Sequence, residues 1–497
     1  MNCHVPWRML IGCLVVFASP SSWSALFDIQ PTLILNEIYS DNIFLNSKNE
    51  EEEYISQVIP GIKVERQGRK MNVYVDYSWE KLLYYRESRL NTSYNRLQAQ
   101  ASAMVDENKF FIDAAGSIRQ QVINNQSRLV LDNINPAART EIKTYSIGPT
   151  LRNHFGSIAD SEVVFRTGKV DYGNTDQFSD SDILRLNASV KSGRRFSGIR
   201  WNAAYSLNET RRAIGDNSKY ELVEGQIASE RYRHLNWFIN GGFINDDIQA
   251  IRAVNDGYFF SVGLRWKPAA NLILSGEYGY NNESASIEYR PTKRAAFLLG
   301  YKNRNLGTNP GTRWSVLFRH NARRYSWNLT YEEDTSNLQQ LEFSAGTNPS
   351  LVNLGGVLID RNSLVFSPSN EDFIRKSIQF NFSITRAKSN IQLRLGGERR
   401  DFLDSTERDQ YTGGNIQWAW RISGRSNLAI NAGYLSRHFG FDQIDDLNLY
   451  GGIAVIRNIS RNIQGQLSYR YVARDGSEGS LGDYQENRVN LGVKIAY

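Results

Sequence analysis

Cysteine and long apolar runs are nearly missing from this chain of 497 residues. Its two cysteines, Cys3 and Cys13, both lie within the first 25 residues. The rest of the chain therefore has no residue for a disulfide, a thiolate metal site or a cysteine nucleophile. After residue 25, no apolar run approaches the roughly 18 residues that a membrane-spanning helix requires, and the mean hydropathy is −0.48.

Histidine is also scarce, with five in the chain. No metal-ligand spacing and no nucleotide-binding loop is present, so we expect no metal, no cofactor and no nucleic-acid partner. A hydrolase would need a serine beside a histidine on one surface. Ser315 lies near His320 in sequence, and Ser436 near His438, but no spacing singles out either pair. We therefore expect no enzymatic activity.

The first residues have the pattern of an export signal. Arg8 precedes a short apolar core, Met9–Ala18, and the small-x-small segment Ser22–Ser24 follows it. This pattern predicts a signal peptide over 1–24, cleaved after Ser24 or Ala25, and a single mature unit over 25–497. The first expected strand begins near Gln30, which leaves no length for a separate plug domain.

Alternation of apolar and polar residues is what the chain has in abundance. A period of two places apolar residues on one face of a β-strand and polar residues on the other. About two dozen segments share the pattern, and no amphipathic helices are available to cover their apolar faces. The set at the carboxyl end is Val489, Leu491, Val493, Ile495 and Tyr497. We expect the barrel assembly machinery to recognise this last strand.

These patterns predict an all-β fold, a single large closed antiparallel transmembrane β-barrel of about 24 strands, with a range of 22 to 26. Lipid would cover the apolar face of the barrel, and closure would leave no unpaired edge. Connections after even-numbered strands are short and those after odd-numbered strands mostly longer, as expected of periplasmic turns and extracellular loops. The predicted location is the outer membrane of a Gram-negative bacterium.

Three segments fit this pattern less well. Pro60 and Pro149 fall inside expected strands, where proline removes a ladder hydrogen bond, and a β-bulge is one interpretation. The segment 285–290 is a weak strand. The longest connection, about 334–372, carries apolar residues of its own between Leu351 and Phe366. That connection either folds into the lumen or over its mouth, or extends the barrel wall as a surface hairpin.

The phase of the alternation assigns the residues that face the lumen. The acidic members are Asp76, Glu80, Glu277 and Glu398. The basic members are Arg185, Lys191, Arg200, Arg265, Arg319, Arg394, Arg421, Arg470, Arg488 and Lys494. A basic-leaning lumen favours hydrated anions or acidic polymers, whereas the simpler interpretation is ordinary charges paired across strands. On the outer face, Trp79, Trp266 and Trp327 are expected in aromatic girdles that contact lipid and lipopolysaccharide.

The segment Pro31–Asn46 resembles the start of a family of bacterial outer-membrane proteins associated with the PEP-CTERM sorting and exopolysaccharide system. The matching residues are Glu37, Tyr39, Asp41 and Asn42. A second likeness lies over Gly356–Glu398. The resemblance implies a barrel that works in exopolysaccharide production or export, with polysaccharide export components as partners.

The leading hypothesis is a porin-like outer-membrane barrel that passes, or helps to export, a polysaccharide or other hydrated solute without chemistry. Two other hypotheses remain open. One is a structural or adhesive scaffold that acts through its loops, and the other is a lipid-modifying hydrolase of the outer membrane.

Overall fold

The computed structural model describes residues 27–122, 134, 139–173, 178–248, 256–307, 310–347, 371–403, 405–440, 444–476 and 483–497. The predicted signal peptide and the apolar stretch between Leu351 and Phe366 lie outside the described residues. Within them, 24 strands follow one another along the chain. Helix α1 (Leu338–Thr347) lies between β17 and β18, and a 3-10 helix, η2 (Ser88–Leu90), lies between β3 and β4.

The first twelve strands are β1 (Asp28–Ser40), β2 (Glu53–Arg66), β3 (Met71–Tyr84), β4 (Thr92–Asp106), β5 (Phe110–Val122), β6 (Arg139–Phe155), β7 (Ala159–Asp171), β8 (Ser181–Ser192), β9 (Ile199–Arg212), β10 (Ser218–Ser229), β11 (Leu235–Ile248) and β12 (Gly257–Ala269). The other twelve are β13 (Leu272–Tyr280), β14 (Asn282–Thr292), β15 (Ala295–Arg304), β16 (Gly311–Asn321), β17 (Tyr325–Asn337), β18 (Asp372–Thr385), β19 (Ser389–Phe402), β20 (Arg408–Arg421), β21 (Ser426–Phe439), β22 (Ile444–Asn458), β23 (Ile463–Gly476) and β24 (Tyr484–Ala496). The weak segment 285–290 is thus the middle of a longer strand, β14.

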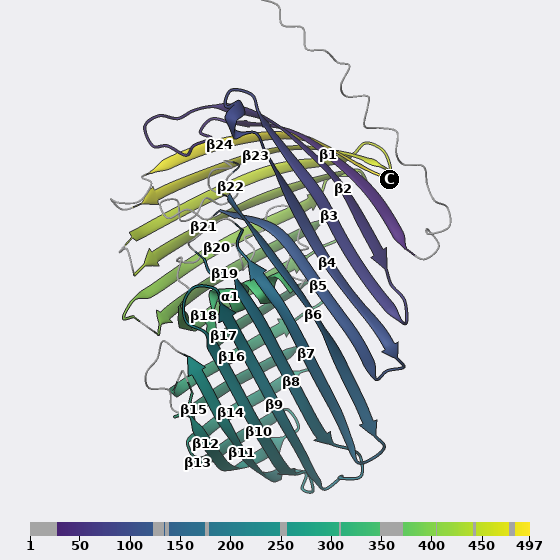
Figure 1. Cartoon of the computed structure of the whole chain (residues 1–497), viewed down its shortest axis with the longest axis vertical. Helices are drawn as coiled ribbons and strands as arrows, with labels where there is room; N and C mark the ends of the chain where they lie inside the picture. The colour runs from purple at the N-terminus through teal and green to yellow at the C-terminus, as the bar shows by residue number, and fades with distance from the viewer. Residues whose placement is uncertain are drawn as a thin grey trace, which may run out of the picture.

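The strands close into one barrel. Each strand pairs antiparallel with the next along the chain, and β1 also pairs with β24 from Thr32↔Ala496 to Ser40↔Arg488. In Figure 1 the strands from β1 to β9 cross in front of those from β15 to β24, so the two sets form opposite sides of the barrel. The predicted fold and strand number are confirmed.

Connection lengths alternate as the sequence indicates. Among the connections that follow even-numbered strands, the longest is 193–198. The connections after odd-numbered strands are mostly longer, up to 338–371, although 281 and 440–443 are short. The former are the periplasmic turns and the latter the extracellular loops.

Apolar side chains cover the outer face of the barrel. On β12, Tyr258, Phe260, Val262, Leu264 and Trp266 alternate along the strand, and each is at least half exposed. On β24, Leu491 is 59% exposed, whereas Glu486 on the other face is 2% exposed. A closed sheet whose apolar face points outward is stable in lipid, where its backbone groups have no water to bind. The protein is therefore an outer-membrane barrel of a Gram-negative bacterium.

The two prolines lie inside strands without a bulge. Pro60 of β2 pairs with Leu33 of β1, and the pairing of β2 with β3 stops at Val58 and resumes at Gly61 in the same register. Pro149 of β6 likewise pairs with β5, while two pairs with β7 are missing between Ile147 and Thr150. The bulge interpretation was wrong. Because proline has no N–H, each strand loses pairing toward one neighbour only.

Side chains fasten the seam between β1 and β24 at the extracellular end. Both oxygens of the Asp41 carboxylate accept hydrogen bonds from Asn487, one from its backbone N–H and one from its side-chain amide, each at 2.7 Å. The Asn42 amide donates to the Gln485 carbonyl at 2.9 Å, and the Ser40 hydroxyl donates to Glu486 at 2.6 Å. The segment that follows β1 thus holds the last strand in place.

We predict that Asp41→Ala weakens this seam. The substitution removes two hydrogen bonds to a charged acceptor, one from a backbone N–H and one from a side-chain amide, which corresponds to about 1–3 kcal/mol. The folded barrel should unfold at a lower temperature in a heating series analysed by SDS gel mobility. Asp106→Ala is the matched control, because within the described residues the Asp106 carboxylate accepts only the neighbouring Glu107 N–H. Equal unfolding temperatures for the two variants would contradict the prediction.

Candidate functional site in the barrel interior

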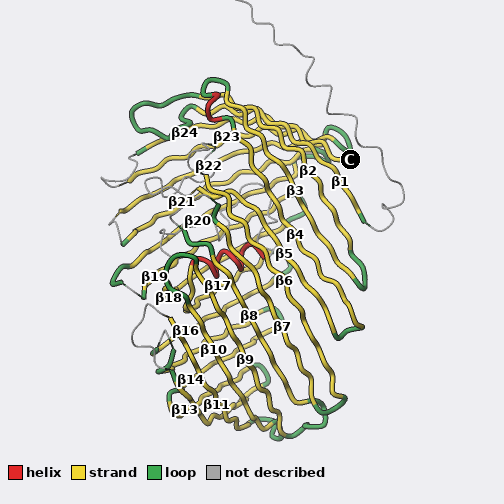
Figure 2. The backbone as a smooth tube through the Cα atoms, viewed as in Figure 1, coloured by secondary structure: helices red, strands yellow, loops and turns green. Residues whose placement is uncertain are grey.

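Helix α1 lies inside the barrel. It follows β17 on one side and contacts β5, β6, β7 and β8 on the other, and Figure 2 shows it between the two sides of the barrel. The side chain of Asn337, the last residue of β17, accepts the Gln340 N–H at 2.9 Å. This contact caps the first turn of the helix and turns the chain from the wall into the lumen.

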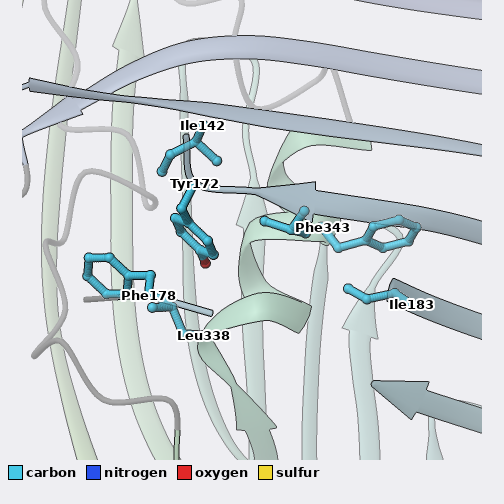
Figure 3. Packing of buried hydrophobic residues seen from close by; sticks show 7 residues of the cluster. Ile142, Tyr172, Phe178, Ile183, Leu338 and Phe343 are labelled. Atoms are coloured by element: carbon cyan, nitrogen blue, oxygen red, sulfur yellow. The ribbon is translucent and has the colours of Figure 1, made fainter. Parts of the chain in front are cut away.

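An apolar cluster attaches α1 to the opposite wall (Figure 3). Its members are Ile142, Val170, Tyr172, Phe178, Ile183, Leu338 and Phe343. Ile142, Val170 and Ile183 come from the inner faces of β6, β7 and β8, and each is at most 1% exposed. Burial raises the pKa of the Tyr172 hydroxyl, which lies in the connection after β7 and stays uncharged. The helix therefore removes from water an apolar patch on the inner face of the barrel.

Polar contacts surround the apolar cluster. Glu342, 2% exposed, forms an ion pair with Arg119 of β5. Arg185 of β8 donates to the Ser344 hydroxyl at 3.3 Å and lies over the Phe343 ring. Two residues of β9 contribute further hydrogen bonds, from Arg212 to Gln339 and from Gln340 to Thr210, both at 3.3 Å. Glu342, the one charged residue in the sequence of α1, thus has a partner on the wall.

Two cavities border the helix. One, of about 720 Å³, is lined by Phe343 of α1 and by Tyr74, Gln100, Asp113, Arg166 and Arg185 among others. The other, of about 410 Å³, is lined by Gln340 of α1 and by Tyr220, Glu224, Lys302, Arg304 and Arg313 among others. Both linings combine charged groups, amides and hydroxyls with aliphatic and aromatic side chains, so either cavity offers hydrogen-bonding partners to a hydrated ligand.

A second segment folds into the interior at the extracellular end. Ile43 packs in a cluster with Ile38, Ile55 and Leu82 of the first three strands. Leu45, two residues later, reaches Tyr450, Val472 and Tyr484 of the last strands. The connection 41–52 therefore covers the inner face on both sides of the seam.

The predicted lumen residues have mixed surroundings. Register places all ten basic residues on the face opposite the exposed apolar side chains. Arg185 contacts α1, Arg200 pairs with Glu230 at 3.0 Å and Arg488 pairs with Glu486 at 2.9 Å. Within the described residues, Lys191, Arg265, Arg319, Arg421 and Lys494 have no carboxylate within 4.0 Å. The structure thus assigns no single role to the set.

The predicted lumen acids are mostly engaged. Glu80 pairs with Arg96 at 2.6 Å, and Glu398 with Arg400 at 2.5 Å. Glu277 accepts hydrogen bonds from the hydroxyls of Ser261 and Ser284. Asp76 accepts the Tyr74 hydroxyl at 3.4 Å.

The tryptophans predicted for the girdles lie on the outer face. Trp79 and Trp266 are 40% and 50% exposed. Trp327 stacks on Phe318 of the neighbouring strand, with ring centroids 4.3 Å apart. Trp266 and Trp327 lie near periplasmic turns, and Trp79 lies nearer the extracellular end of β3.

The two serine–histidine pairs differ in geometry. Ser315 and His320 are five residues apart on β16, so they point to opposite faces and cannot act together. Ser436 and His438 share the outer face of β21, and His438 Nδ1 lies 2.6 Å from Asp445 Oδ1 on β22. Among the described residues, no hydrogen bond joins Ser436 to His438, and no group of three His, Cys, Asp or Glu could hold a metal ion. No described helix is long and apolar enough to span a membrane.

Comparison with known proteins yields only distant structural likeness. No protein-family model and no curated protein matches the chain. The FrpB iron transporter of Neisseria meningitidis is 10% identical, with 96% of this chain and 82% of that chain covered and a TM-score of 0.44. The siderophore receptor PirA of Pseudomonas aeruginosa is 10% identical, with 94% and 80% covered and a TM-score of 0.41. The ferric-catecholate import receptor Fiu of E. coli K12 is 7% identical, with 95% and 82% covered and a TM-score of 0.48. Such distant likeness identifies no substrate for this chain.

We predict that Glu342→Gln loosens α1. The substitution leaves Arg119 without its anion, and breaking such a partly buried pair should make detachment of the helix about tenfold more frequent. Leu341→Cys, introduced into the native protein, the Glu342→Gln variant and the control variant, reports detachment through its rate of reaction with a maleimide. The control is Glu230→Gln, which breaks an exposed ion pair of β9 that does not touch α1. Equal labelling rates in all backgrounds would contradict the prediction.

Proposed function

We propose that the protein is an outer-membrane channel for a hydrated solute of the polysaccharide class, and that α1 controls its opening. The observation that carries this proposal is the position of the helix. It lies across the lumen, covalently joined to β17 and attached by side chains to β5–β8. A helix that only extended the wall would have no reason to contact the opposite side.

The width of the barrel supports a conduit. The lumen of a barrel of this strand number is too wide for wall side chains alone to fill, and it either carries water or is occupied by another element. Here the described occupants include α1 and the connection 41–52, and the linings of the remaining cavities mix charged and amide groups with apolar side chains. Amides, hydroxyls and arginines can exchange hydrogen bonds with the hydroxyl groups of a sugar chain.

The contacts of α1 are suited to reversible release. One ion pair, three hydrogen-bonding side chains and one small apolar cluster hold it. These contacts are made through side chains. Those of Glu342, Gln339 and Arg212 are buried and contribute more to stability, whereas the contact of Ser344 is exposed and contributes modestly. The helix can therefore leave the wall without disturbing the hydrogen-bonded ladders of the barrel.

We predict that removing the contacts of α1 raises conductance. The variant replaces 338–347 by a Gly-Ser sequence of equal length, so that the connection keeps its length and loses its attachment. Planar-bilayer recordings should show larger and steadier currents than the native protein gives. The control replaces 403–407, another extracellular connection, in the same way. If neither the native barrel nor the variant carries current, the protein is a filled scaffold and the channel proposal fails.

A second candidate function is favoured by one local arrangement. In register, His438 lies directly opposite Asp445, and their side chains form a 2.6 Å contact. An acid that orients Nδ1 leaves Nε2 free to take a proton from a serine. Ser436 lies on the same outer face, next to exposed Tyr434 and Leu449. The Ser436 hydroxyl would attack the carbonyl carbon of a lipid ester while His438 takes its proton, and the alcohol would leave with that proton. Water would then cleave the acyl-serine and release the fatty acid, which would make the barrel a lipid hydrolase.

We predict that this second function, if it operates, depends on Ser436. Purified barrel in detergent would release fatty acid from phospholipid, and Ser436→Ala and His438→Gln would each abolish the release because the nucleophile or its base is lost. Ser423→Ala, in an exposed turn, should leave the rate unchanged. Absence of fatty-acid release from the native protein would eliminate the hydrolase.

A further inference from the structure

Charge is segregated between the two ends of the barrel. The eleven periplasmic turns together contain fifteen Lys and Arg residues and two acidic residues. Among the described residues, the twelve extracellular connections contain twelve acidic residues and three Lys and Arg residues. The net charge of the whole chain is only +6, so this separation is invisible in the composition and emerges once the connections are assigned to the two ends.

The basic collar, defined as the Lys and Arg residues of the periplasmic turns, runs around most of the mouth. Nine of the eleven turns contribute to it. Three turns that lie near one another contribute two residues each, and these are Lys293, Arg294, Arg323, Arg324, Arg386 and Lys388.

The collar is available to a ligand. All of its residues are exposed. Among the described residues, only Arg69 has a carboxylate within 4.0 Å, that of Glu107 at 3.8 Å. A ring of unneutralised cations raises the local concentration of anions at the opening it surrounds.

Positive charge continues from the collar into the lumen. Lys191, Arg265, Arg319, Arg421 and Lys494 lie near the periplasmic ends of β8, β12, β16, β20 and β24, which is every fourth strand. Their register directs them inward, and within the described part of the chain they too have no carboxylate within 4.0 Å. An anionic chain that reaches the collar therefore meets further unpaired cations inside the mouth.

We propose that the basic collar receives an acidic polysaccharide, a sugar polymer that bears carboxylates, from the periplasm and guides it into the lumen. The proposal rests on the proposed channel function and narrows its solute to a polyanion that enters from the periplasmic side. The carboxylates make exchangeable pairs with the collar, and no bond forms or breaks. Because exposed pairs are individually weak and are screened by salt, the chain is held by many contacts and can still advance.

The distribution of charge favours a polymer over other anions. A folded acidic protein would need a patch on one side of the mouth, whereas the collar extends over nine turns. Anionic lipid headgroups could contact the turns from outside, but they cannot reach the cations on the inner face, because the wall of the barrel lies between. A flexible polyanion can contact both the cations of the collar and the cations on the inner face.

Binding can be tested without conduction. The full-length barrel is placed in nanodiscs of phosphatidylcholine, and its affinity for oligogalacturonate is compared with that for maltodextrin of equal length. We expect oligogalacturonate to bind, with an affinity that falls steeply as salt rises, and maltodextrin not to bind. The triple variant Arg323→Gln, Arg324→Gln, Arg386→Gln should bind about tenfold more weakly.

The matched control is the triple variant Lys48→Gln, Arg86→Gln, Arg89→Gln at the extracellular end, which should keep the native affinity. Heat-modifiable gel mobility verifies that both variants are folded. Equal binding of the two sugars, or equal losses in the two variants, would overturn the proposal. So would a collar variant that changes only the adsorption of the barrel to phosphatidylglycerol vesicles, since the collar would then serve lipid.

The outcome is separable from that of the channel proposal. If the barrel binds oligogalacturonate through the collar but carries no current, the inference about the collar stands and the channel proposal fails. If the barrel conducts but shows no preference for the acidic sugar, the channel proposal stands and the inference about the collar fails.

Discussion

Backbone hydrogen bonding in lipid is the constraint on which this structure depends. A strand that faces hydrocarbon has no water to satisfy its N–H and C=O groups, so each strand must pair with a neighbouring strand on both sides. The chain meets this requirement by pairing β1 with β24, and the side chains that follow β1 reinforce the closing ladder. Asp41 and Asn42, two residues of the resemblance seen in the sequence, lie at this seam. Their part in it is structural, whatever solute the barrel serves.

A closed barrel also has an inside, and its inner face is not uniformly polar. Ile55, Leu82, Ile142 and Ile183 point inward and are fully buried. Apolar side chains in a water-filled lumen would lose the free energy of burial, about 25 cal/mol for each Å² left in water. The connection 41–52 and helix α1 cover these patches, so the same apolar residues that interrupt the lumen's polarity also explain why segments fold into it.

The alternation of apolar and polar residues predicted the barrel, the strand number and the outer face, because the same period of two recurs in every strand. It predicted less about the interior. Leu82 and Ile183 fall in the polar phase, and an apolar residue in that phase is the signal that something packs there. The partner, α1, was not predicted, since a helix of ten residues between two strands leaves no long amphipathic pattern. The prediction that the longest connection folds into the lumen or over its mouth rested on its apolar residues between Leu351 and Phe366, and these lie outside the described residues. The positive charge of the periplasmic turns was not predicted, because no single turn contributes more than two Lys or Arg residues.

The proline positions have a mechanical consequence. The missing pairs at Pro60 lie between β2 and β3, and those at Pro149 lie between β6 and β7. They delimit a four-stranded panel, β3–β6, whose own ladders have one register shift, between Met104 and Asp106 of β4. Stiffness in a sheet comes from its cross-strand bonds, so the sheet bends more easily at the two sites of missing pairs. Two strands of that panel, β5 and β6, contact α1. The missing pairs between β6 and β7 thus lie within the part of the wall that holds the helix, which contacts strands on both sides of them, so a small hinge motion there changes the surface on which the helix rests.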